Sequence, residues 1–408
     1  MAASTKVVAV IGTLDTKGVE FAFLKRAIEA AGAKAFVIDT GILSAPPFAP
    51  DIAAAAVAAA AGADLATLVT RKDRGEAVTV MGKGAAIVLA TLARDGMIDG
   101  AIAMGGGGGT AIAATAMQAL PIGFPKLIVS TLAAGDISPY VGVKDITMMP
   151  SVVDIAGINR LSRAIIENAA GAIAGMVNAD RGSAVDSKPL LAATMFGVTT
   201  PCVTTARAVL EAAGYEVLVF HATGTGGRTM EELIRGGFIE GVLDVTTTEL
   251  ADELVGGVLT AGPNRLTAAG ASGIPQVVSL GALDMVNFGT PESVPAKFSA
   301  RTFYHHNPMV TLMRTTVAEN AELGAILARK LNAARGPTVL MIPRAGVSGI
   351  DVAGKPFHDP AADAALFGAL RAGVRRNVRL VEMDTNINDP AFATEAARQL
   401  LALLPPRD

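Results

Sequence analysis

The sequence predicts an α/β protein made of two doubly wound, Rossmann-like domains, each built on a parallel sheet. Short apolar runs rich in β-branched residues alternate with longer stretches of helical periodicity along the chain, which is the pattern of βαβ units. Three segments of the first half also recur, in the same order, in the second half. We interpret this repeat as an internal duplication.

The first half opens with the apolar run VVAVIG (7–12), which predicts a strand. A helical pattern over 19–31 follows and ends at Gly32, and the run 35–41 predicts the next strand. Further strands are expected at 101–104 and 127–130, and further helices at 52–61, 74–94, 110–120 and 158–176.

The matches between the halves show how much the first half adds. AIEAAGAKAFVID (27–39) matches VLEAAGYEVLVFH (209–221) at an offset of 182, whereas LARDGMIDG (92–100) matches LIRGGFIEG (233–241) at an offset of 141. The first half therefore holds 41 additional residues between these two landmarks. This length leaves room for an added helix pair.

The polar stretch NADRGSAVDSKP (178–189) separates the halves and predicts a linker, so we expect domains over 1–180 and 188–408. Ligands of open parallel sheets bind beyond the carboxyl ends of the strands, which is where functional motifs are to be sought. In the second domain we expect helices at about 308–333, 361–372 and 390–404, and strands at 338–343 and 378–383.

Composition narrows the classes of function. The net charge of -3 and the absence of tryptophan argue against nucleic-acid binding. A charged fraction of only 17% of the 408 residues indicates extensive buried packing. The uncharged stretch 100–125 could span a bilayer by length, but five consecutive glycines and Pro121 would break the helix. A single cysteine, Cys202, and the lack of a leader-like segment favour the cytoplasm. We expect a cytoplasmic protein without nucleic-acid or membrane partners.

A run of five glycines is the strongest local feature. Glycine lets the backbone approach an anion closely, and the free N–H groups and dipole at a helix N-terminus favour negative charge. The alternative is close packing of a helix against a strand, but five glycines exceed what packing requires. The run and the residue that opens the helix are Gly105, Gly106, Gly107, Gly108, Gly109 and Thr110.

The loop GTLDTKG after the first predicted strand places Thr13, Asp15, Thr16 and Lys17 at a strand end. It fits neither the dinucleotide fingerprint nor the P-loop. Asp15 or Thr16 could serve as an ordinary helix N-cap. In a doubly wound sheet, however, this loop would face the glycine run, so Lys17 could meet a phosphate. Residues 39–41, at the end of the next strand, could meet a ribose or a base.

In the second domain, HATGTGGRT (221–229) also joins a strand to a helix. It only approximates a P-loop, because alanine replaces the first glycine and arginine replaces the lysine. Gly224, Gly226, Gly227 and Arg228 could form a phosphate or carboxylate cradle, and a tight turn is the alternative.

Candidate catalytic residues are His305, His306, Arg314 and Asp384, which lie near predicted strand or helix ends. Each could equally pin a loop or form a buried ion pair. No metal-ligand spacing of a recognised type is present. Cys202 starts a predicted helix, where a thiol pKa is lowered, but a small buried filler is the favoured interpretation.

Several long motifs resemble an uncharacterised bacterial and fungal family that shares a domain with the tomato tobamovirus-resistance inhibitor, the Tm-1-like ATP-binding proteins. The resemblance covers nearly the entire chain and implies an ATP-binding N-terminal domain of Rossmann-like topology, a second α/β domain and a homodimer. The motifs are VIGTLDTKG (10–18), DRGEAV (73–78), MGGGGGT (104–110), FHATGTGG (220–227), HHNPMVTLMRTT (305–316), GVSGID (346–351), KPFHDP (355–360) and NINDPAFA (386–393).

The resemblance also implies a nucleotide site. It would use Thr13, Asp15, Thr16 and Lys17, the strand end at Thr40, and the glycine run with Thr110. The segment STLAAGD would close it through Thr131, Gly135 and Asp136. The glycine run departs from the family in having no serine among its glycines.

We therefore expect an ATP-binding protein whose nucleotide lies at the strand ends of the N-terminal domain, with the need for Mg²⁺ left open. A small acidic metabolite, carboxylate or phosphate, would bind in an interdomain cleft near Arg228 and the candidate catalytic residues. The alternative is a non-catalytic, nucleotide-dependent regulatory or protein-binding module. Whether the protein is an enzyme stays open at this point.

Overall fold

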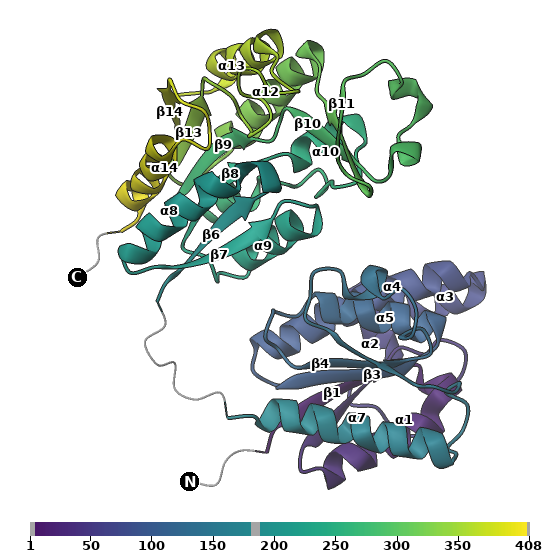
Figure 1. Cartoon of the computed structure of the whole chain (residues 1–408). Coiled ribbons are helices and arrows are strands. Elements are labelled where there is room, and N and C mark those ends of the chain that lie inside the picture. Colours follow the sequence, from purple (N-terminus) through teal and green to yellow (C-terminus); the bar gives the residue numbers. More distant parts are fainter. Residues whose placement is uncertain (1–4, 181–187, 406–408) are drawn as a thin grey trace. The chain divides into compact units, whose positions relative to one another are not determined.

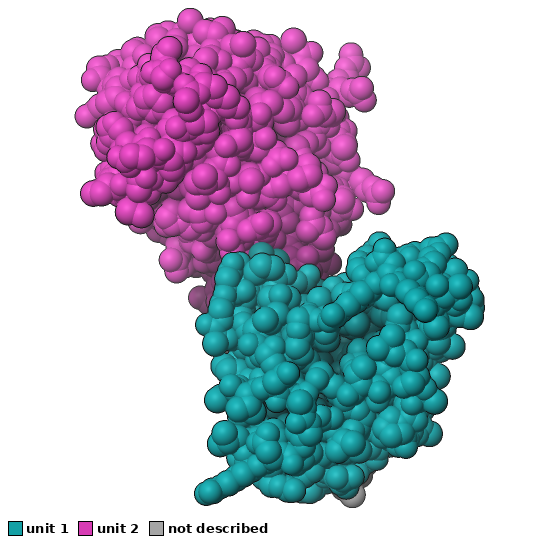
Figure 2. Space-filling view, turned by 90° about the vertical axis from the view of Figure 1, so that its right-hand side faces the viewer, with its two compact units in different colours: residues 1–184 teal, residues 185–408 magenta. Residues whose placement is uncertain are grey.

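The computed structural model describes residues 5–180 and 188–405. The chain forms two compact units, residues 1–184 (unit 1) and residues 185–408 (unit 2), which are coloured separately in Figure 2. Each unit folds around its own parallel sheet. Most of the predicted linker, residues 181–187, lies outside the described residues.

A five-stranded parallel sheet forms the middle layer of unit 1, in the order β2-β1-β3-β4-β5. The central strands are almost entirely buried apolar runs, as expected for a parallel sheet that is covered on both faces. The strands are β1 (Val7–Gly12), β2 (Lys34–Asp39), β3 (Gly100–Gly105), β4 (Lys126–Ser130) and β5 (Thr147–Pro150).

Helices cover both faces of this sheet (Figure 1). α1 and α7 pack on one face, and α2, α4 and α5 pack on the other. The additional residues of the first half include the short pair α2 and α3, between β2 and α4. The helices are α1 (Leu14–Ala30), α2 (Ala54–Ala60), α3 (Leu65–Arg71), α4 (Arg74–Arg94), α5 (Gly107–Gln118), α6 (Ser138–Val141) and α7 (Arg160–Asn178).

α4 is long and apolar enough, by length and composition alone, to cross a membrane, and α2 and α3 pass the same test only as a pair bent by 95°. In unit 1, α4 packs against α2 and α5 and buries Met81, Leu89 and Leu92. The core helix of an α/β domain has the same character, so this property does not by itself mark a membrane segment.

Unit 2 contains a six-stranded parallel sheet in the order β14-β13-β9-β8-β6-β7. Counted along its own parallel strands, unit 2 places the second strand beside the first and continues with the third, fourth and fifth, as unit 1 does. The predicted fold class, two doubly wound Rossmann-like domains, is confirmed. The strands are β6 (Leu190–Met195), β7 (Glu216–His221), β8 (Gly241–Thr246), β9 (Gln276–Gly281), β13 (Thr338–Pro343) and β14 (Val378–Met383).

In unit 2, α8 and α14 pack on one face of the sheet, whereas α12 and α13 pack on the other (Figure 1). α9 and α11 pack together near the β7 end of the sheet. The helices are α8 (Thr200–Ala212), α9 (Thr225–Arg235), α10 (Glu249–Val255), α11 (Ala268–Ser272), α12 (Val317–Asn332), α13 (Pro360–Gly373) and α14 (Pro390–Leu403).

The helix expected over 308–333 is wrong in its first part. A three-stranded antiparallel sheet, in the order β10-β12-β11, takes up this region. The helix α12 begins only at Val317, because Thr316 and Glu319 form a reciprocal capping box ahead of it. The three strands are β10 (Met285–Phe288), β11 (Phe303–Asn307) and β12 (Val310–Arg314).

Candidate functional site

A pocket of about 790 Å³ lies in unit 1 beyond the carboxyl ends of β1, β2 and β3. Its polar floor contains four of the predicted glycines, Gly106 to Gly109, at the start of α5. The loop after β1 and the end of β2 add further predicted residues. These are Thr13, Asp15, Thr16, Lys17 and Thr40.

Packing explains only the first glycine of the run. A Cβ at Gly105 would lie 2.7 Å from the Cα of Gly109, so a side chain does not fit there. A Cβ at Gly107 would meet no atom within 4 Å, and one at Gly106 would meet only the Thr131 hydroxyl, at 3.7 Å. None of the five has a positive φ. The close-packing alternative therefore fails for the glycines that line the pocket.

The glycines place backbone donors at the start of α5, beside the pocket. α5 begins at Gly107, and its N-cap residue Gly106 has no side chain with which to cap it. The N–H groups of Gly107, Gly108 and Gly109 consequently have no acceptor within their own helix. Glycine destabilises a helix by about 0.5–1 kcal/mol relative to alanine. The first turn of α5 is therefore less stable than an alanine-rich turn, but no side chains cover its backbone N–H groups.

Thr110 and the segment after β4 do not line the pocket. The Thr110 hydroxyl is buried, donates to the Gly105 carbonyl at 3.2 Å and lies 2.7 Å from the Ser130 hydroxyl, so it fastens α5 to the sheet. Asp136 accepts a hydrogen bond from Ser138 N at 2.9 Å, at the start of α6. Gly105, Thr110, Thr131, Gly135 and Asp136 are thus absent from the pocket lining.

Another wall of the pocket is formed by α3, α4 and the turn between them. Arg74 is the central cation of this wall, because its Nη2 lies 3.6 Å from the position that a Cβ of Gly108 would take. The neighbouring Arg71 pairs with Glu76. Among the residues that the structure describes, none forms an ion pair or hydrogen bond with Arg74. The wall consists of Val69, Lys72, Asp73, Arg74, Ala77, Val78 and Met81.

Sequence reasoning missed this wall as part of the site. Two signals pointed towards it: the 41 additional residues of the first half, and the motif DRGEAV at 73–78. Neither signal showed that Arg74 would reach the glycine run, since that contact arises only when α4 packs against α5.

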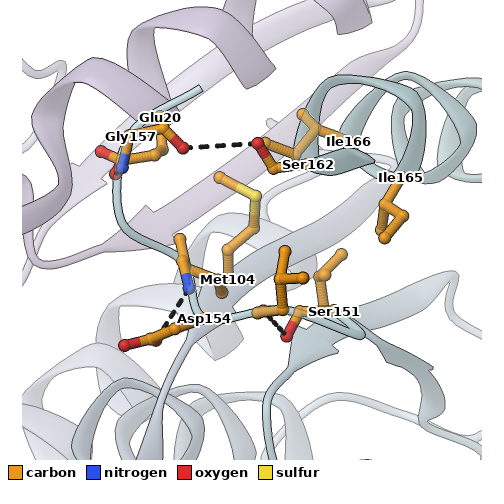
Figure 3. A pocket seen from close by; sticks show the side chains of 11 residues that line it. Glu20, Met104, Ser151, Asp154, Gly157, Ser162, Ile165 and Ile166 are labelled. Atoms are coloured by element: carbon orange, nitrogen blue, oxygen red, sulfur yellow. Dashed lines mark hydrogen bonds between the residues drawn. The ribbon is translucent and has the colours of Figure 1, made fainter. Parts of the chain in front are cut away.

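Lys17 lines the pocket, but its ammonium already has a partner. It donates to the carbonyl of Ile155, in the segment that follows β5. Ile155 also borders a small cavity of about 10 Å³, enough for about one water molecule (Figure 3). Beside this cavity, Gly157 N donates to Glu20 at 2.5 Å, and the Ser162 hydroxyl donates to the Gly157 carbonyl at 3.3 Å. The segment after β5, whose Ile155 carbonyl accepts the hydrogen bond from Lys17, is therefore anchored to α1 and α7.

Asp39 is not among the residues that line the pocket. Its carboxylate accepts hydrogen bonds from Leu14 N at 3.1 Å and Gly41 N at 2.8 Å, and burial raises its pKa. It therefore braces the two strand-end loops. The capping interpretation of Asp15 and Thr16 is also wrong, because α1 starts at Leu14 and has no side-chain cap.

The cradle predicted in unit 2 is already occupied by the chain itself. Glu249 Oε1 accepts hydrogen bonds from Gly224 N at 2.7 Å and Gly227 N at 3.1 Å. A Cβ at Gly227 would fall 2.1 Å from the same carboxylate, so glycine is needed there for packing. Arg228 is exposed, and its Nη2 lies 3.4 Å from the Thr225 hydroxyl. The prediction of a free anion cradle at Gly224, Gly226 and Gly227 is wrong.

Glu249 belongs to a buried ionic network. The fully buried Arg265 donates from Nε to Glu249 at 2.5 Å and from Nη2 to Asp244 at 2.7 Å. Glu231 lies 3.6 Å from the same guanidinium and accepts from Leu266 N at 2.6 Å. Burial opposes the charge of Arg265, but the surrounding carboxylates raise its pKa well above its usual value. The network ties α9, β8 and α10 together.

The candidate catalytic residues do not form one site. Arg314 is buried and pairs with Asp351 at 2.9 Å and Asp363 at 2.7 Å, which is the ion-pair alternative. His305 and His306 are exposed on β11, outside this ion-pair cluster.

Asp384 is exposed and pairs with Arg344 after β14. Cys202 is buried, and burial raises its pKa to about 12, which confirms the filler interpretation. Within residues 5–180 and 188–405, no group of three or more histidine, cysteine, aspartate or glutamate side chains is arranged to hold a metal ion.

Comparison with known proteins places the chain among relatives. Residues 6–182 and 188–404 match the N-terminal and C-terminal domains of a family described as "Uncharacterised protein family (UPF0261)". A UPF0261 protein of Clostridium tetani is 53% identical over 400 residues, which are 98% of this chain and 99% of that protein. The ToMV resistance protein Tm-1 of Solanum lycopersicum is 44% identical over 339 residues, which are 81% of this chain and 45% of the plant protein.

Among solved structures, UDP-N-acetylglucosamine 2-epimerase from Rickettsia bellii has a TM-score of 0.24 and 8% identity, covering 67% of this chain and 78% of that one. The kinship with the tomato protein that the motifs indicated is confirmed at the level of the family. Both domain matches and the full-length identity with the clostridial protein show that the chain belongs to the UPF0261 family.

Proposed function

We propose that unit 1 binds ATP in the pocket beyond β1, β2 and β3. The observation that carries this proposal is that the guanidinium of Arg74, which has no partner among the described residues, lies beside Gly108, a glycine that packing does not demand. Both belong to the lining of a pocket of about 790 Å³, a volume typical of cofactor and small-ligand sites.

The polyphosphate would lie at the N-terminus of α5. Three free N–H groups, from Gly107 to Gly109, and the helix dipole point towards it. Each such interaction is worth about 0.3–1 kcal/mol when exposed, so a phosphate needs several of them together. Arg74 adds a planar fork that suits two phosphate oxygens at once, and Lys72 adds a second exposed cation on the same wall.

The base would pack at the apolar end of the pocket. Ile42 and Leu43 follow β2, and Val69 lies on α3. Leu43 is 74% exposed and Val69 is 42% exposed, so both offer apolar surface to a ligand in this pocket. Val78 and Met81 of α4 continue this surface. A nucleotide would therefore place its apolar and anionic ends on matching parts of the wall.

Binding without turnover is the second candidate. The pocket lining contains no histidine, cysteine or tyrosine, and its two carboxylates already accept backbone hydrogen bonds: Asp73 from Glu76 N at 3.0 Å, and Asp15 from Leu43 N at 2.7 Å. These contacts favour a nucleotide-dependent regulatory or protein-binding module. The acidic second ligand, Mg²⁺, the homodimer and the cytoplasmic location stay predictions.

Isothermal titration calorimetry of the purified chain against ATP, ADP, AMP and inorganic phosphate tests the proposal, with phosphate release measured in parallel. We expect ATP and ADP to bind more tightly than AMP. The proposal fails if no nucleotide binds. Binding without phosphate release supports the non-catalytic module, whereas release that saturates with ATP supports an enzyme.

A further inference from the structure

Two side-chain oxygen atoms, one in the first turn of α1 and one directly after β2, have no hydrogen-bond partner in the part of the chain that the structure describes. They are Oδ1 of Asp15 and Oγ1 of Thr40, and both are shielded from bulk solvent. Buried polar groups in native proteins are nearly always paired, so an unpaired oxygen in a pocket wall calls for an explanation. Both residues line the proposed nucleotide pocket.

The carboxylate of Asp15 is held in place by the backbone of the next loop. Its Oδ2 accepts a hydrogen bond from Leu43 N at 2.7 Å. A Cβ at Gly41 would lie 2.4 Å from the Asp15 Cγ and 2.5 Å from Oδ1, so only glycine lets the carboxylate lie this close. The Asp15 carboxylate is thus fixed in position, with Oδ2 accepting a hydrogen bond and Oδ1 without a partner among the described residues.

Thr40 precedes Gly41, the residue against which this carboxylate lies, and is only 2% exposed. Its backbone N–H donates to the Gly12 carbonyl at 2.8 Å, which fixes its position between β1 and β2. Its hydroxyl can both donate and accept a hydrogen bond. Asp39, at the end of β2, accepts hydrogen bonds from Leu14 N and Gly41 N, both on its Oδ1.

We propose that Asp15 and Thr40 form a subsite for the vicinal hydroxyl groups of a ribose, so that the pocket selects ribonucleotides over deoxyribonucleotides; this inference rests on the proposed nucleotide function. A diol supplies two O–H donors and two acceptors. One hydroxyl donates to Oδ1 of Asp15, and its neighbour exchanges a hydrogen bond with the Thr40 hydroxyl. A deoxyribose leaves one of these buried oxygens unpaired.

Strand order places this subsite at a suitable distance from the phosphate end. β2 neighbours β1, and β1 neighbours β3, which leads into the glycine run. Adjacent strands lie about 4.8 Å apart, so the ends of β2 and β3 are separated by roughly 10 Å. A ribose at Thr40 would extend its 5′ polyphosphate across the end of β1 to the N-terminus of α5. A di- or triphosphate is therefore a better match than a monophosphate.

The test compares ATP, 2′-deoxyATP and 3′-deoxyATP by titration calorimetry on the full chain. Losing a hydrogen bond to a charged group corresponds to roughly a tenfold or greater loss of affinity, so ATP should bind about tenfold more tightly than either analogue. Thr40→Val replaces an unpaired hydroxyl by a methyl group and should fold normally, yet it should reduce the preference for ATP. Asp15→Asn should do the same.

Thr115→Val is the matched control, because Thr115 is exposed on α5, donates to the Ala111 carbonyl at 2.9 Å and does not line the pocket. It should keep the full preference. Equal affinities of the wild-type chain for ATP and both deoxy analogues would overturn the ribose subsite and leave nucleotide binding standing. Equal losses for ATP and the analogues in Thr40→Val would also overturn it. No binding of any nucleotide would overturn the proposed function and the subsite together.

Discussion

The carboxylate of Glu249 accepts a hydrogen bond from the backbone N–H of Gly227, at 3.1 Å, and so fills the N-terminus of α9 from within. β3 begins at Gly100 and β8 at Gly241, and the same offset of 141 residues relates Gly108 to Glu249. The two units thus carry a glycine and a glutamate at matching positions after matching strands. In unit 2 this glutamate supplies an anion to the strand-end loop before α9, whereas the matching residue of unit 1 is a glycine that lines the pocket.

Gly107→Val should abolish nucleotide binding without unfolding unit 1. A side chain at this position meets no protein atom within 4 Å, so the valine would project into free space near the backbone donors. We expect a loss of the ATP-induced rise in melting temperature, measured by differential scanning fluorimetry. Gly171→Val is the control, because Gly171 is also helical and also free of contacts, but lies on α7. An ATP response that persists in Gly107→Val would remove the glycine run from the site.

Arg74→Gln should weaken ATP binding more than AMP binding. The guanidinium faces Gly108 and has no partner among the described residues, so its loss removes a phosphate contact without breaking an internal ion pair. A charge-assisted hydrogen bond is worth about 1.5–3 kcal/mol, or roughly ten- to a hundredfold in Kd for ATP. Titration calorimetry gives this ratio. Arg94→Gln, at the opposite end of α4, should match the wild type, and an equal loss for AMP and ATP would contradict the phosphate assignment.

Glu249→Ala should destabilise unit 2 and leave nucleotide affinity unchanged. The substitution leaves the N–H groups of Gly224 and Gly227 without their hydrogen-bond acceptor. It also removes one of the carboxylates around the buried Arg265. Breaking a buried pair from one side typically costs about 3–5 kcal/mol, which urea unfolding followed by circular dichroism would detect. Arg228→Ala, a change to an exposed side chain, should stay within about 0.5 kcal/mol of the wild type. Wild-type stability in Glu249→Ala would show that the network is dispensable.

Regular elements were predicted well where local signals are complete. The strands at 338–343 and 378–383 and the helix at 74–94 agree with the structure to the residue. A buried apolar run defines the first strand and a valine-containing, mostly apolar run defines the second. Asp73 caps the helix by accepting a hydrogen bond from Glu76 N. Such signals lie within one segment and need no knowledge of the rest of the chain.

The site was predicted only in part, because much of it depends on contacts between distant segments. Thr13, Asp15, Lys17 and the glycine run could be found, since they stand at strand ends. Arg74 could not be assigned, because the packing of α4 on α5 brings it to Gly108. The wrong prediction in unit 2 has the same origin: Glu249 lies 22 residues beyond Gly227, and only the fold shows that its carboxylate fills the cradle.

The buried cluster around Arg314 should make the stability of unit 2 depend on pH. Three carboxyl groups, from Asp284, Asp351 and Asp363, surround one guanidinium. Burial, and then repulsion from the other two acids, raises the pKa of Asp351 to about 9, and burial raises that of Asp284 to about 6. In the unfolded chain these groups titrate near 3.9. The folded chain therefore retains protons that the unfolded chain has already released.

Because the folded state binds more protons, these groups stabilise unit 2 fully below about pH 4, and this contribution is lost as pH rises towards about 9. Asp351→Asn stays neutral throughout, so its melting temperature should fall less between pH 5.5 and pH 8 than that of the wild type. Each 1 kcal/mol corresponds to about 2–4 °C in a unit of this size, which calorimetry resolves. Asp384→Asn, which changes an exposed carboxylate, should follow the wild type. Parallel wild-type and Asp351→Asn curves would show that Asp351 is ionised in the folded chain at neutral pH.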